Sequence, residues 1–249
     1  QYWLFLDRLL HANLGTSLIY NTGTSTLIWQ RLPVTLWLIV YATVLAIIIS
    51  VPLAMIAATR KDGVRDHAVR AIPLVGLGMP PFFVGFVLIY LFGINEHWFP
   101  VGGYGQGFVG HLRSMFLPAL TVAIALSPVV IRSLRASMLN VLGADFITTA
   151  KSKGVGGPRL FFRHVLRNAV IPAITVLGIN IGFLIGGTVV VESVFALPGV
   201  GQLMINSIFQ RDFPVVQGVT LVFAVLVVLV NLLADMAYAA LDPRVSFDR

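Results

Sequence analysis

The chain has 249 residues, of which 57% are hydrophobic and 11% charged, against about 25% charged residues in soluble domains; with a mean hydropathy of +0.91, this excludes an ordinary soluble domain and favours an integral membrane protein. A net charge of +7 would suggest nucleic acid as partner for a soluble protein, but here the basic residues lie between apolar runs, so membrane topology accounts for them. The absence of cysteine excludes disulfides, thiolate zinc sites and a cysteine nucleophile.

The first segment, 1–32, precedes the long apolar runs and is predicted to lie outside the membrane. Its opening residues, from Tyr2 to Leu10, suggest a short amphipathic helix on the outer surface, but an interfacial belt is the preferred explanation of their aromatic side chains. The chain opens at Gln1 rather than Met, so we expect that it is trimmed or that an upstream span is not included.

Five apolar stretches follow, each near the 20 residues or so that a bilayer core requires: 34–58, 72–94, 116–138, 169–191 and 214–240. They are continuous rather than alternating and about twice as long as a barrel strand, so helices are predicted. The expected fold is therefore all-α: a polytopic helical bundle forming one transmembrane domain over 33–241, followed by a tail at 242–249.

Proline and glycine recur within these stretches. Proline frees a backbone carbonyl and bends a membrane helix, which suits a protein that moves but is also common in ordinary packing; the residues concerned are Pro52, Pro73, Pro80, Pro81, Pro118, Pro128 and Pro172. Gly178, Gly182 and Gly186 recur at intervals of four and share one helix face. They predict a close approach by another helix of the bundle or by a second subunit.

Basic residues concentrate in alternate loops. One set contains Arg60, Lys61, Arg65, Arg70, Arg132, Arg135, Lys151, Lys153, Arg159, Arg163, Arg167, Arg244 and Arg249, and the opposite set contains only Arg8, Arg31, Arg113 and Arg211. By the positive-inside rule the first set is cytoplasmic. We therefore expect a multi-pass protein of the cytoplasmic (inner) membrane, with the N-terminus of this chain outside and its C-terminal tail in the cytoplasm.

The cytoplasmic loop 140–168 is predicted to contain a short polar helix. Asp145 is suited to cap it, and Gly154 to end it in the left-handed conformation. Beyond a Gly156-Gly157-Pro158 turn, a basic stretch carries arginines spaced by four, as in an interfacial helix whose arginines meet lipid headgroups. That explanation does not extend to the short helix itself, whose small side chains around Thr149 would let it sit deep in a groove.

Four polar residues in or near the spans are candidates for a translocation path or gate: Asn180, Glu192, Asn231 and Asp235. Asp235 follows Asn231 by four residues and shares its face, but solvation or pairing with a cytoplasmic arginine is the preferred alternative. Asn180 is expected to hydrogen-bond across helices instead. The sequence leaves open whether Glu192 orients the external loop or faces the path.

Catalytic and metal-binding patterns are absent from the sequence. No two of the five histidines have metal-ligand spacing on one helix, so no metal site is expected. There is no phosphate-binding loop of the form G-x-x-x-x-G-K-[ST], and no G-x-S-x-G or HExxH motif. If ATP drives this protein, other chains must bind it.

The run from Asp145 to Gly154, followed by His164 to Pro172, resembles the coupling-loop signature of binding-protein-dependent ABC transporter permeases, and more narrowly of their dipeptide, oligopeptide and nickel branch. The wider superfamily carries Glu-Ala-Ala, three residues and then glycine. Here Thr148-Thr149-Ala150 occupies the first three positions, so only Ala150 and Gly154 match. The peptide branch also usually lacks the glutamate.

Further motifs extend the resemblance over nearly the whole chain. The external segment, the loop before the last span and the C-terminal ending of the family are matched by Asn13 to Ser17, by Glu192 to Phe195 with Leu197 to Gly201, by Arg211 to Pro214, and by Leu241 to Arg244. The first of these resembles the first (B-type) permease of peptide systems. Intact members of this kind have six spans, one of them ahead of the external segment.

The resemblance implies an ABC type I importer permease fold and no catalytic site. The coupling helix that docks on a cytoplasmic ATPase would comprise Asp145, Phe146, Thr148, Thr149, Ala150, Lys151, Lys153 and Gly154. The implied partners are two ABC ATPase subunits, which would carry ATP and Mg²⁺ so that this chain holds no cofactor, a second homologous permease, and an extracytoplasmic substrate-binding protein that meets loops 95–115 and 192–213.

The cargo implied is di- or oligopeptides, with nickel or another small solute carried by the same scaffold as the alternative. The alternative from a different class is a secondary transporter driven by an ion gradient. Such a transporter would need an ion site near the middle of the membrane, for which the kinked spans are suited but no strong carboxylate is present.

Overall fold

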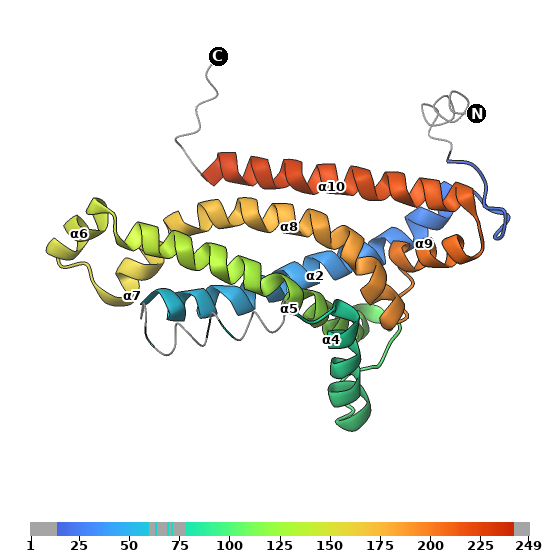
Figure 1. Cartoon of the computed structure of the whole chain (residues 1–249), viewed down its shortest axis with the longest axis horizontal. Coiled ribbons are helices and arrows are strands. Elements are labelled where there is room, and N and C mark those ends of the chain that lie inside the picture. Colours follow the sequence, from blue (N-terminus) through green and yellow to red (C-terminus); the bar gives the residue numbers. More distant parts are fainter. Residues whose placement is uncertain (1–13, 60–62, 64–68, 70, 72–77, 242–249) are drawn as a thin grey trace, which may run out of the picture. The chain divides into compact units, whose positions relative to one another are not determined.

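The computed structural model describes residues 14–59, 63, 69, 71 and 78–241 (Figure 1). Within that part of the chain the regular structure is helical, apart from an isolated bridge between Thr16 and Gly23. The elements are α2 (Thr24–Thr59), α4 (Pro81–Leu88), η1 (a π-helix, Ile89–Asn95), α5 (Gly107–Leu142), α6 (Asp145–Ser152), α7 (Gly157–Leu160), η2 (a π-helix, Phe161–Leu166), α8 (Arg167–Val194), α9 (Val200–Phe209) and α10 (Phe213–Leu241).

The helices expected from hydropathy are present. Of those described, four are long and apolar enough to cross a membrane: Thr24–Thr59, Gly107–Leu142, Gly157–Val194 and Phe213–Ala240. They contain the expected spans 34–58, 116–138 and 169–191, and 214–240 coincides with α10. The remaining stretch, 72–94, overlaps the shorter apolar helix Pro81–Asn95, while 72–77 lies outside the described residues.

The helices extend beyond the apolar runs that predicted them. α2 begins at Thr24, so part of the segment 1–32 that was expected outside the membrane is helical. Polar residues next to an apolar run can also be helical. The start of a helix is therefore set by the preceding turn and not by the first apolar residue. The prolines within α2, α5 and α8 do not end these helices, because membrane helices tolerate proline when their surroundings satisfy the freed carbonyl.

The chain comprises two compact units, each built from three stretches of sequence. Unit 1 contains Gln1–Ala42, Pro80–Val122 and Phe183–Val228. Unit 2 contains Thr43–Met79, Ala123–Gly182 and Leu229–Arg249. The four long helices contribute residues to both units, so each unit has its own core of helix–helix contacts.

The core of unit 2 combines small residues of one helix with large residues of others. Ala54, Ala57 and Ala58 of α2 are buried in one cluster with Leu134 and Met138 of α5. Small side chains let helix backbones approach closely, and the longer ones fill the space between them. The same cluster includes residues that follow α5: Ile147, Leu160, Val165, Ala169 and Ala173. The loop between α5 and α8 is thus part of the core and not a free excursion.

The glycine face of α8 is used at one position for close packing. At Gly178, an added Cβ would overlap the Cβ of Ala234 on α10, so the two helices approach within unit 2 only because Gly178 has no side chain. An added Cβ at Gly186 would have no described neighbour within 4 Å. The predicted close approach is therefore confirmed at Gly178, whereas Gly186 lies open.

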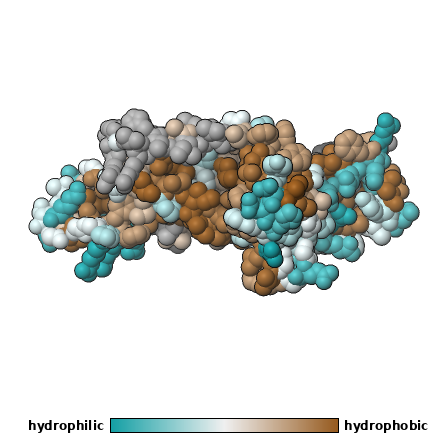
Figure 2. All heavy atoms as spheres, turned by 90° about the horizontal axis from the view of Figure 1, so that it is seen from below, coloured by the Kyte–Doolittle hydropathy of each residue, from teal (hydrophilic) through white to brown (hydrophobic). Residues whose placement is uncertain are grey.

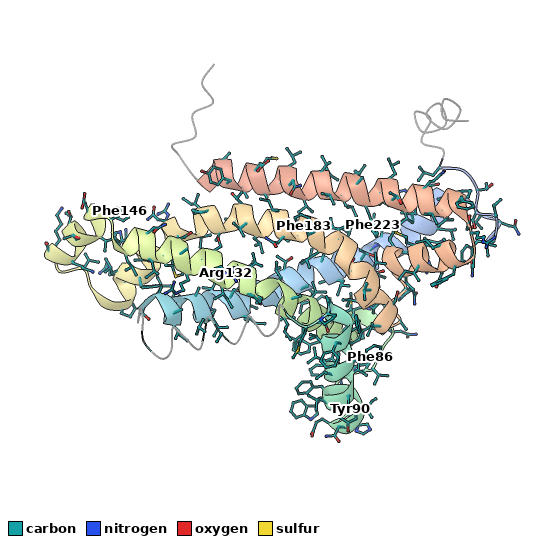
Figure 3. All side chains as sticks on the ribbon, viewed as in Figure 1. Phe86, Tyr90, Arg132, Phe146, Phe183 and Phe223 are labelled. Carbon is teal, nitrogen blue, oxygen red and sulfur yellow. The ribbon has the colours of Figure 1, made fainter. Side chains whose placement is uncertain are left out.

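The core of unit 1 joins α2 to the last two helices. Leu27, Ile28 and Leu32 of α2 are buried with Val200 and Leu203 of α9 and with Val215 and Val219 of α10. At Gly218, an added Cβ would lie 2.7 Å from Cγ2 of Thr24. α10 therefore approaches the first turn of α2 at a glycine. The helix made by α4 and η1 also belongs to unit 1, and Phe86 and Tyr90 project from it (Figure 3).

Substituting alanine at the two contrasting glycines of α8 tests this packing. Gly178→Ala should destabilise the protein by about 1–3 kcal/mol, because its methyl group overlaps Ala234. Gly186→Ala should be neutral or stabilising by up to about 1 kcal/mol, because alanine favours helix and the position is open. Thermal unfolding of both purified variants measures the difference; equal midpoints would contradict the close approach at Gly178.

Candidate functional site

The helix α6 is the predicted short polar helix, and it begins one residue earlier than a cap at Asp145 would require. Its N-cap is Ala144, which has extended backbone angles and makes no side-chain cap hydrogen bond. The prediction that Asp145 caps the helix is therefore wrong: Asp145 is the first helical residue and is exposed. Its negative charge still lies at the positive end of the helix dipole, which is a favourable place.

The C-terminal end of α6 is closed by glycine, as predicted. Gly154 has φ +79°, in the left-handed region. Its N–H donates to the carbonyl of Lys151 at 2.9 Å, and the N–H of Val155 donates to the carbonyl of Ala150 at 3.0 Å. This pair of bonds is the Schellman arrangement, which satisfies carbonyls that a helix end otherwise leaves free. Ala150 and Val155 both pack against the core of unit 2, which fixes the position of the helix end.

One face of α6 is fixed in the core and the other is presented outward. Ile147 is fully buried in the core cluster of unit 2, and Ala150 is half-buried beside it. The remaining residues of the expected docking helix are exposed: Asp145, Phe146, Thr148, Thr149, Lys151, Lys153 and Gly154. Phe146 has 48% of its surface exposed and projects from α6 (Figure 3). The anchoring role of Ile147 was missed, although its spacing of three from Ala150 was the available signal.

Two hydroxyl groups on the outer face donate hydrogen bonds within the helix. Thr149 Oγ1 donates to the carbonyl of Asp145 and Ser152 Oγ to the carbonyl of Thr148, each at 3.1 Å. These side chains therefore lie along the helix instead of reaching outward. The exposed face is a short, compact surface with one large apolar side chain and two lysines.

The four candidates for a path or gate are divided between the two units. Asn180, Asn231 and Asp235 belong to unit 2, and Glu192 belongs to unit 1. Asn180 donates from Nδ2 to the carbonyl of Val176 in its own helix at 2.7 Å, in place of the expected bond across helices. Asn231 is half-buried and Asp235 is exposed on α10, one turn apart.

Glu192 is buried in unit 1 and holds the start of α9. Its Oε1 accepts from Thr35 Oγ1 at 2.7 Å, and its Oε2 accepts from the backbone N–H of Gln202 at 3.0 Å. Thr35 Oγ1 in turn accepts from the N–H of Val200 at 2.9 Å. Because the first N–H groups of a helix have no partner within it, this pair of side chains supplies the cap that α9 lacks locally. The geometry favours an orienting role for Glu192 over an open position on a path.

Two glycines make room for this carboxylate. An added Cβ at Gly199 would overlap the carboxylate of Glu192, and one at Gly201 would lie 2.6 Å from Cα of Val189. The Leu197-Pro198-Gly199-Val200-Gly201 motif is therefore a cradle for Glu192. A carboxylate that accepts at both oxygens is well placed at the positive end of α9.

A second buried carboxylate joins two motifs that are far apart in the sequence. Ser17 Oγ donates to Oδ2 of Asp212, and the N–H of Leu18 donates to Oδ1 at 3.3 Å. Asp212 is fully buried at the turn between α9 and α10. The motif ending at Ser17 and the motif at Arg211 to Pro214 thus form one contact, while Asn13 lies outside the described residues.

The loop before α5 is attached to the loop after α8 in the same unit. The N–H of Gly103 donates to the carbonyl of Phe195 at 2.9 Å, and an added Cβ at Gly102 would lie 2.7 Å from that oxygen. Ser114 Oγ donates to the carbonyl of Tyr104 at 2.7 Å. The two loops that were expected to meet an external protein are therefore in contact with each other.

The described residues contain no group of three or more histidine, cysteine, aspartate or glutamate side chains that could hold a metal ion. His111 is engaged locally: its Nδ1 lies 2.8 Å from the carbonyl of Tyr104, and its ring stacks on the Tyr104 ring at 4.0 Å.

Sequence comparison finds a family match and close relatives. The family of binding-protein-dependent transport system inner membrane components matches residues 50–247. The oligopeptide transport system permease protein AppB of Bacillus subtilis (strain 168) is 40% identical over 253 residues, which cover 99% of this chain and 80% of that protein. The glutathione transport system permease protein GsiC of Pectobacterium atrosepticum is 36% identical over 247 residues, covering 99% and 79%.

Solved structures show the same fold at low sequence identity. An inward-facing form of the MetNI methionine ABC transporter matches with a TM-score of 0.71 and 16% identity over 87% of this chain and 96% of that chain. An amino acid ABC transporter with histidines matches with a TM-score of 0.66 and 16% identity over 87% and 94%. These likenesses confirm the expected all-α ABC type I importer permease fold.

Removing the buried carboxylate should loosen the start of α9. Glu192→Ala leaves the N–H of Gln202 without its partner in a buried place, so amide hydrogen exchange at Gln202 should accelerate by about tenfold to a hundredfold. Glu192→Gln should have a smaller effect, because its amide oxygen still accepts from that N–H. Exchange measured by mass spectrometry checks this, with exposed Glu96→Ala as the matched control; unchanged exchange in Glu192→Ala would contradict the capping role.

Proposed function

Because the chain belongs to the family of binding-protein-dependent transport system inner membrane components, we propose that it is the first permease of an ATP-driven importer that moves oligopeptides across the cytoplasmic membrane. A second homologous permease completes the path, an external binding protein delivers the peptide, and two cytoplasmic ATPase subunits drive alternating access. The family match supports this mechanism over transport driven by an ion gradient.

The observation that carries the proposal is the construction of α6. Its eight residues are closed at the C-terminal end by Gly154 and held in the core of unit 2 by Ile147, while Phe146 and the lysines are exposed. A packed core does not deform continuously, so a force applied to the exposed face moves the packed helices with it. We infer that this face enters a cleft on the ATPase.

The chemistry of ATP hydrolysis belongs to other subunits. The sequence contains no phosphate-binding loop, so ATP and Mg²⁺ are bound by the ATPases, and this chain is moved by their conformational change. Phe146 would supply apolar burial in the cleft, and Lys151 and Lys153 would pair with acidic groups there. The contribution of this chain is to position α6 and to open and close a path.

The membrane orientation follows from the basic residues around α6. We place the loop 140–168 and the tail 242–249 in the cytoplasm and the segment 1–32 outside, by the positive-inside rule. The loops that the buried Gly103–Phe195 and Ser17–Asp212 contacts hold in place then face the external binding protein.

The cargo is assigned by relatives and not by a pocket in this chain. AppB is named for oligopeptides and GsiC for glutathione, which is itself a peptide. We therefore propose peptides over nickel or another small solute. The external binding protein would select among peptides, and retention of peptides by that partner is the direct test of the cargo.

A single cysteine tests the docking of α6, because the natural chain contains none. Cysteine in place of exposed Thr149 should crosslink to a cysteine introduced in the cleft of the co-expressed ATPase. As the matched control for topology, cysteine in place of Phe209, which is 84% exposed in unit 1, should instead react with a membrane-impermeant reagent added outside cells. Labelling of the Thr149 position from outside would contradict the orientation.

Substitutions at the neighbouring residues Phe146 and Ile147 of α6 should have different effects on coupling to ATP hydrolysis and on thermal stability. Phe146→Ala removes an exposed side chain, so thermal stability should change by less than about 0.5 kcal/mol while peptide-stimulated ATP hydrolysis falls. Ile147→Ala leaves a cavity in the core and should destabilise the protein by about 2–5 kcal/mol.

Uptake of labelled peptide, ATP hydrolysis and thermal unfolding are measured on the same assembled transporter. A partner ATPase lacking its Walker lysine should abolish uptake in every case. Normal coupling in Phe146→Ala would exclude a docking role for this face, and persistence of uptake without a competent ATPase would exclude the importer itself.

A further inference from the structure

A line of exposed arginines runs from α7 to the start of α8. Arg159, Arg163 and Arg167 are all exposed, and each follows the previous one by four residues. The opposite side of the same segment is fixed: Leu160 and Val165 are buried in the core of unit 2, and Phe161 and Leu166 pack against it. The three cations thus lie on the exposed face of a segment whose orientation is set by the packing of its apolar side chains. We call this face the arginine face.

The π-helix η2 keeps these arginines aligned. In an α-helix, a spacing of four exceeds one turn of 3.6 residues, so successive side chains drift round the axis. A π-helix bonds i to i+5 and takes more residues per turn, so the same spacing falls short of one turn. The step from Arg159 to Arg163 contains residues of both α7 and η2, so the two deviations offset each other there, and the step from Arg163 to Arg167 runs through η2. The arginines therefore remain on one face.

The helix that carries the arginine face is longer than the bilayer core is thick, and this places the arginine face relative to the membrane. α7, η2 and α8 run on as a single helix of 38 residues, Gly157–Val194, whereas a bilayer core requires about 20. The apolar span 169–191 fills the hydrocarbon, so the segment carrying the arginines precedes it and lies at headgroup level. Phe162, which is 56% exposed, lies beside Arg163 and is suited to the boundary between headgroups and acyl chains.

The described part of unit 2 has few carboxylates to pair with these arginines. Its described residues include two carboxylates, Asp145 and Asp235, against seven basic side chains: Arg132, Arg135, Lys151, Lys153, Arg159, Arg163 and Arg167. On the face drawn in Figure 2, hydrophilic residues gather over the end of unit 2 that carries α6 and α7, beside hydrophobic ones. A concentrated positive charge at the membrane surface attracts anions.

We propose that the arginine face binds the phosphate groups of anionic phospholipids in the leaflet at this end of α8. Guanidinium groups pair with phosphate through two parallel hydrogen bonds, and basic residues at the membrane surface attract anionic lipid. The face is continuous with the lipid-embedded span of α8, which places headgroups within its reach. This site is separate from the exposed face of α6 and does not depend on ATPase docking.

Lipid bound to the arginine face would affect α6, because the two segments are packed in the same core. Val165 of η2 and Ile147 of α6 are buried in one cluster, so a segment pinned to headgroups holds the base of α6 in place. Anionic lipid would thus provide the fixed support against which α6 is moved. In a membrane without anionic lipid, the segment would be held only by its apolar side.

The test counts anionic lipid on the assembled transporter. The full complex is reconstituted in nanodiscs of phosphatidylcholine with an equal part of phosphatidylglycerol, transferred to detergent, and analysed by native mass spectrometry for retained phosphatidylglycerol. Arg163→Gln should weaken retention roughly fivefold, and the triple Arg159→Gln, Arg163→Gln, Arg167→Gln variant by about a hundredfold, following the contribution of each basic residue near an anionic surface. Arg211→Gln, an exposed arginine of unit 1, is the matched control and should retain lipid normally.

Three outcomes would overturn the proposal. Equal lipid retention by the triple variant and the unchanged protein would show that the arginines do not bind lipid. Displacement of phosphatidylglycerol by inorganic phosphate alone would assign the face to a soluble anion. Loss of the ATPase subunits from the triple variant, with lipid retained, would assign it to the motor. Lipid retention is measured without ATP hydrolysis, so failure here is distinct from failure of the importer proposal.

Discussion

Burial of Ile147 is the contact on which the functional surface of this protein depends. A short polar helix of eight residues is too short to be stable alone in water, because helix nucleation is unfavourable and few hydrogen bonds follow it. Ile147 places α6 in the same core as Met138 of α5 and Val165 of η2. The exposed face therefore has a fixed direction, and a fixed direction is what a surface that transmits force requires.

In unit 1, the loops contain buried backbone groups and carboxylates, which need hydrogen-bond partners within the protein. Glu192 and Thr35 cap α9, and Asp212 binds Ser17 at the next turn. Each carboxylate is placed where backbone N–H groups or a hydroxyl donate to it, so that burial does not leave a charge without partners. The glycines at 199 and 201 are part of this arrangement, because side chains there would occupy the space of Glu192.

The outer face of α6 and the arginine face lie on successive helical segments of one loop. The outer face of α6 is suited to a protein cleft, with one exposed phenylalanine and hydroxyls that bond within the helix. The arginine face is suited to phosphate, with three exposed cations and an aromatic neighbour. Both are supported by the same apolar cluster, so motor and bilayer would act on one packed element of unit 2.

The sequence by itself determined the class of fold, most span positions, the short helix ending at Gly154 and the family resemblance. The length of each apolar run, a glycine suited to a helix end and the order of short motifs can all be read directly along the chain. The prediction of a cap at Asp145 was wrong, since the extended backbone of Ala144 shifts the helix start. Only the tertiary structure decided that Ile147 faces inward, that Glu192 meets Thr35 across 157 residues, and that Ser17 meets Asp212 across 195. Burial and hydrogen bonding between distant residues depend on how helices pack, which no local period encodes.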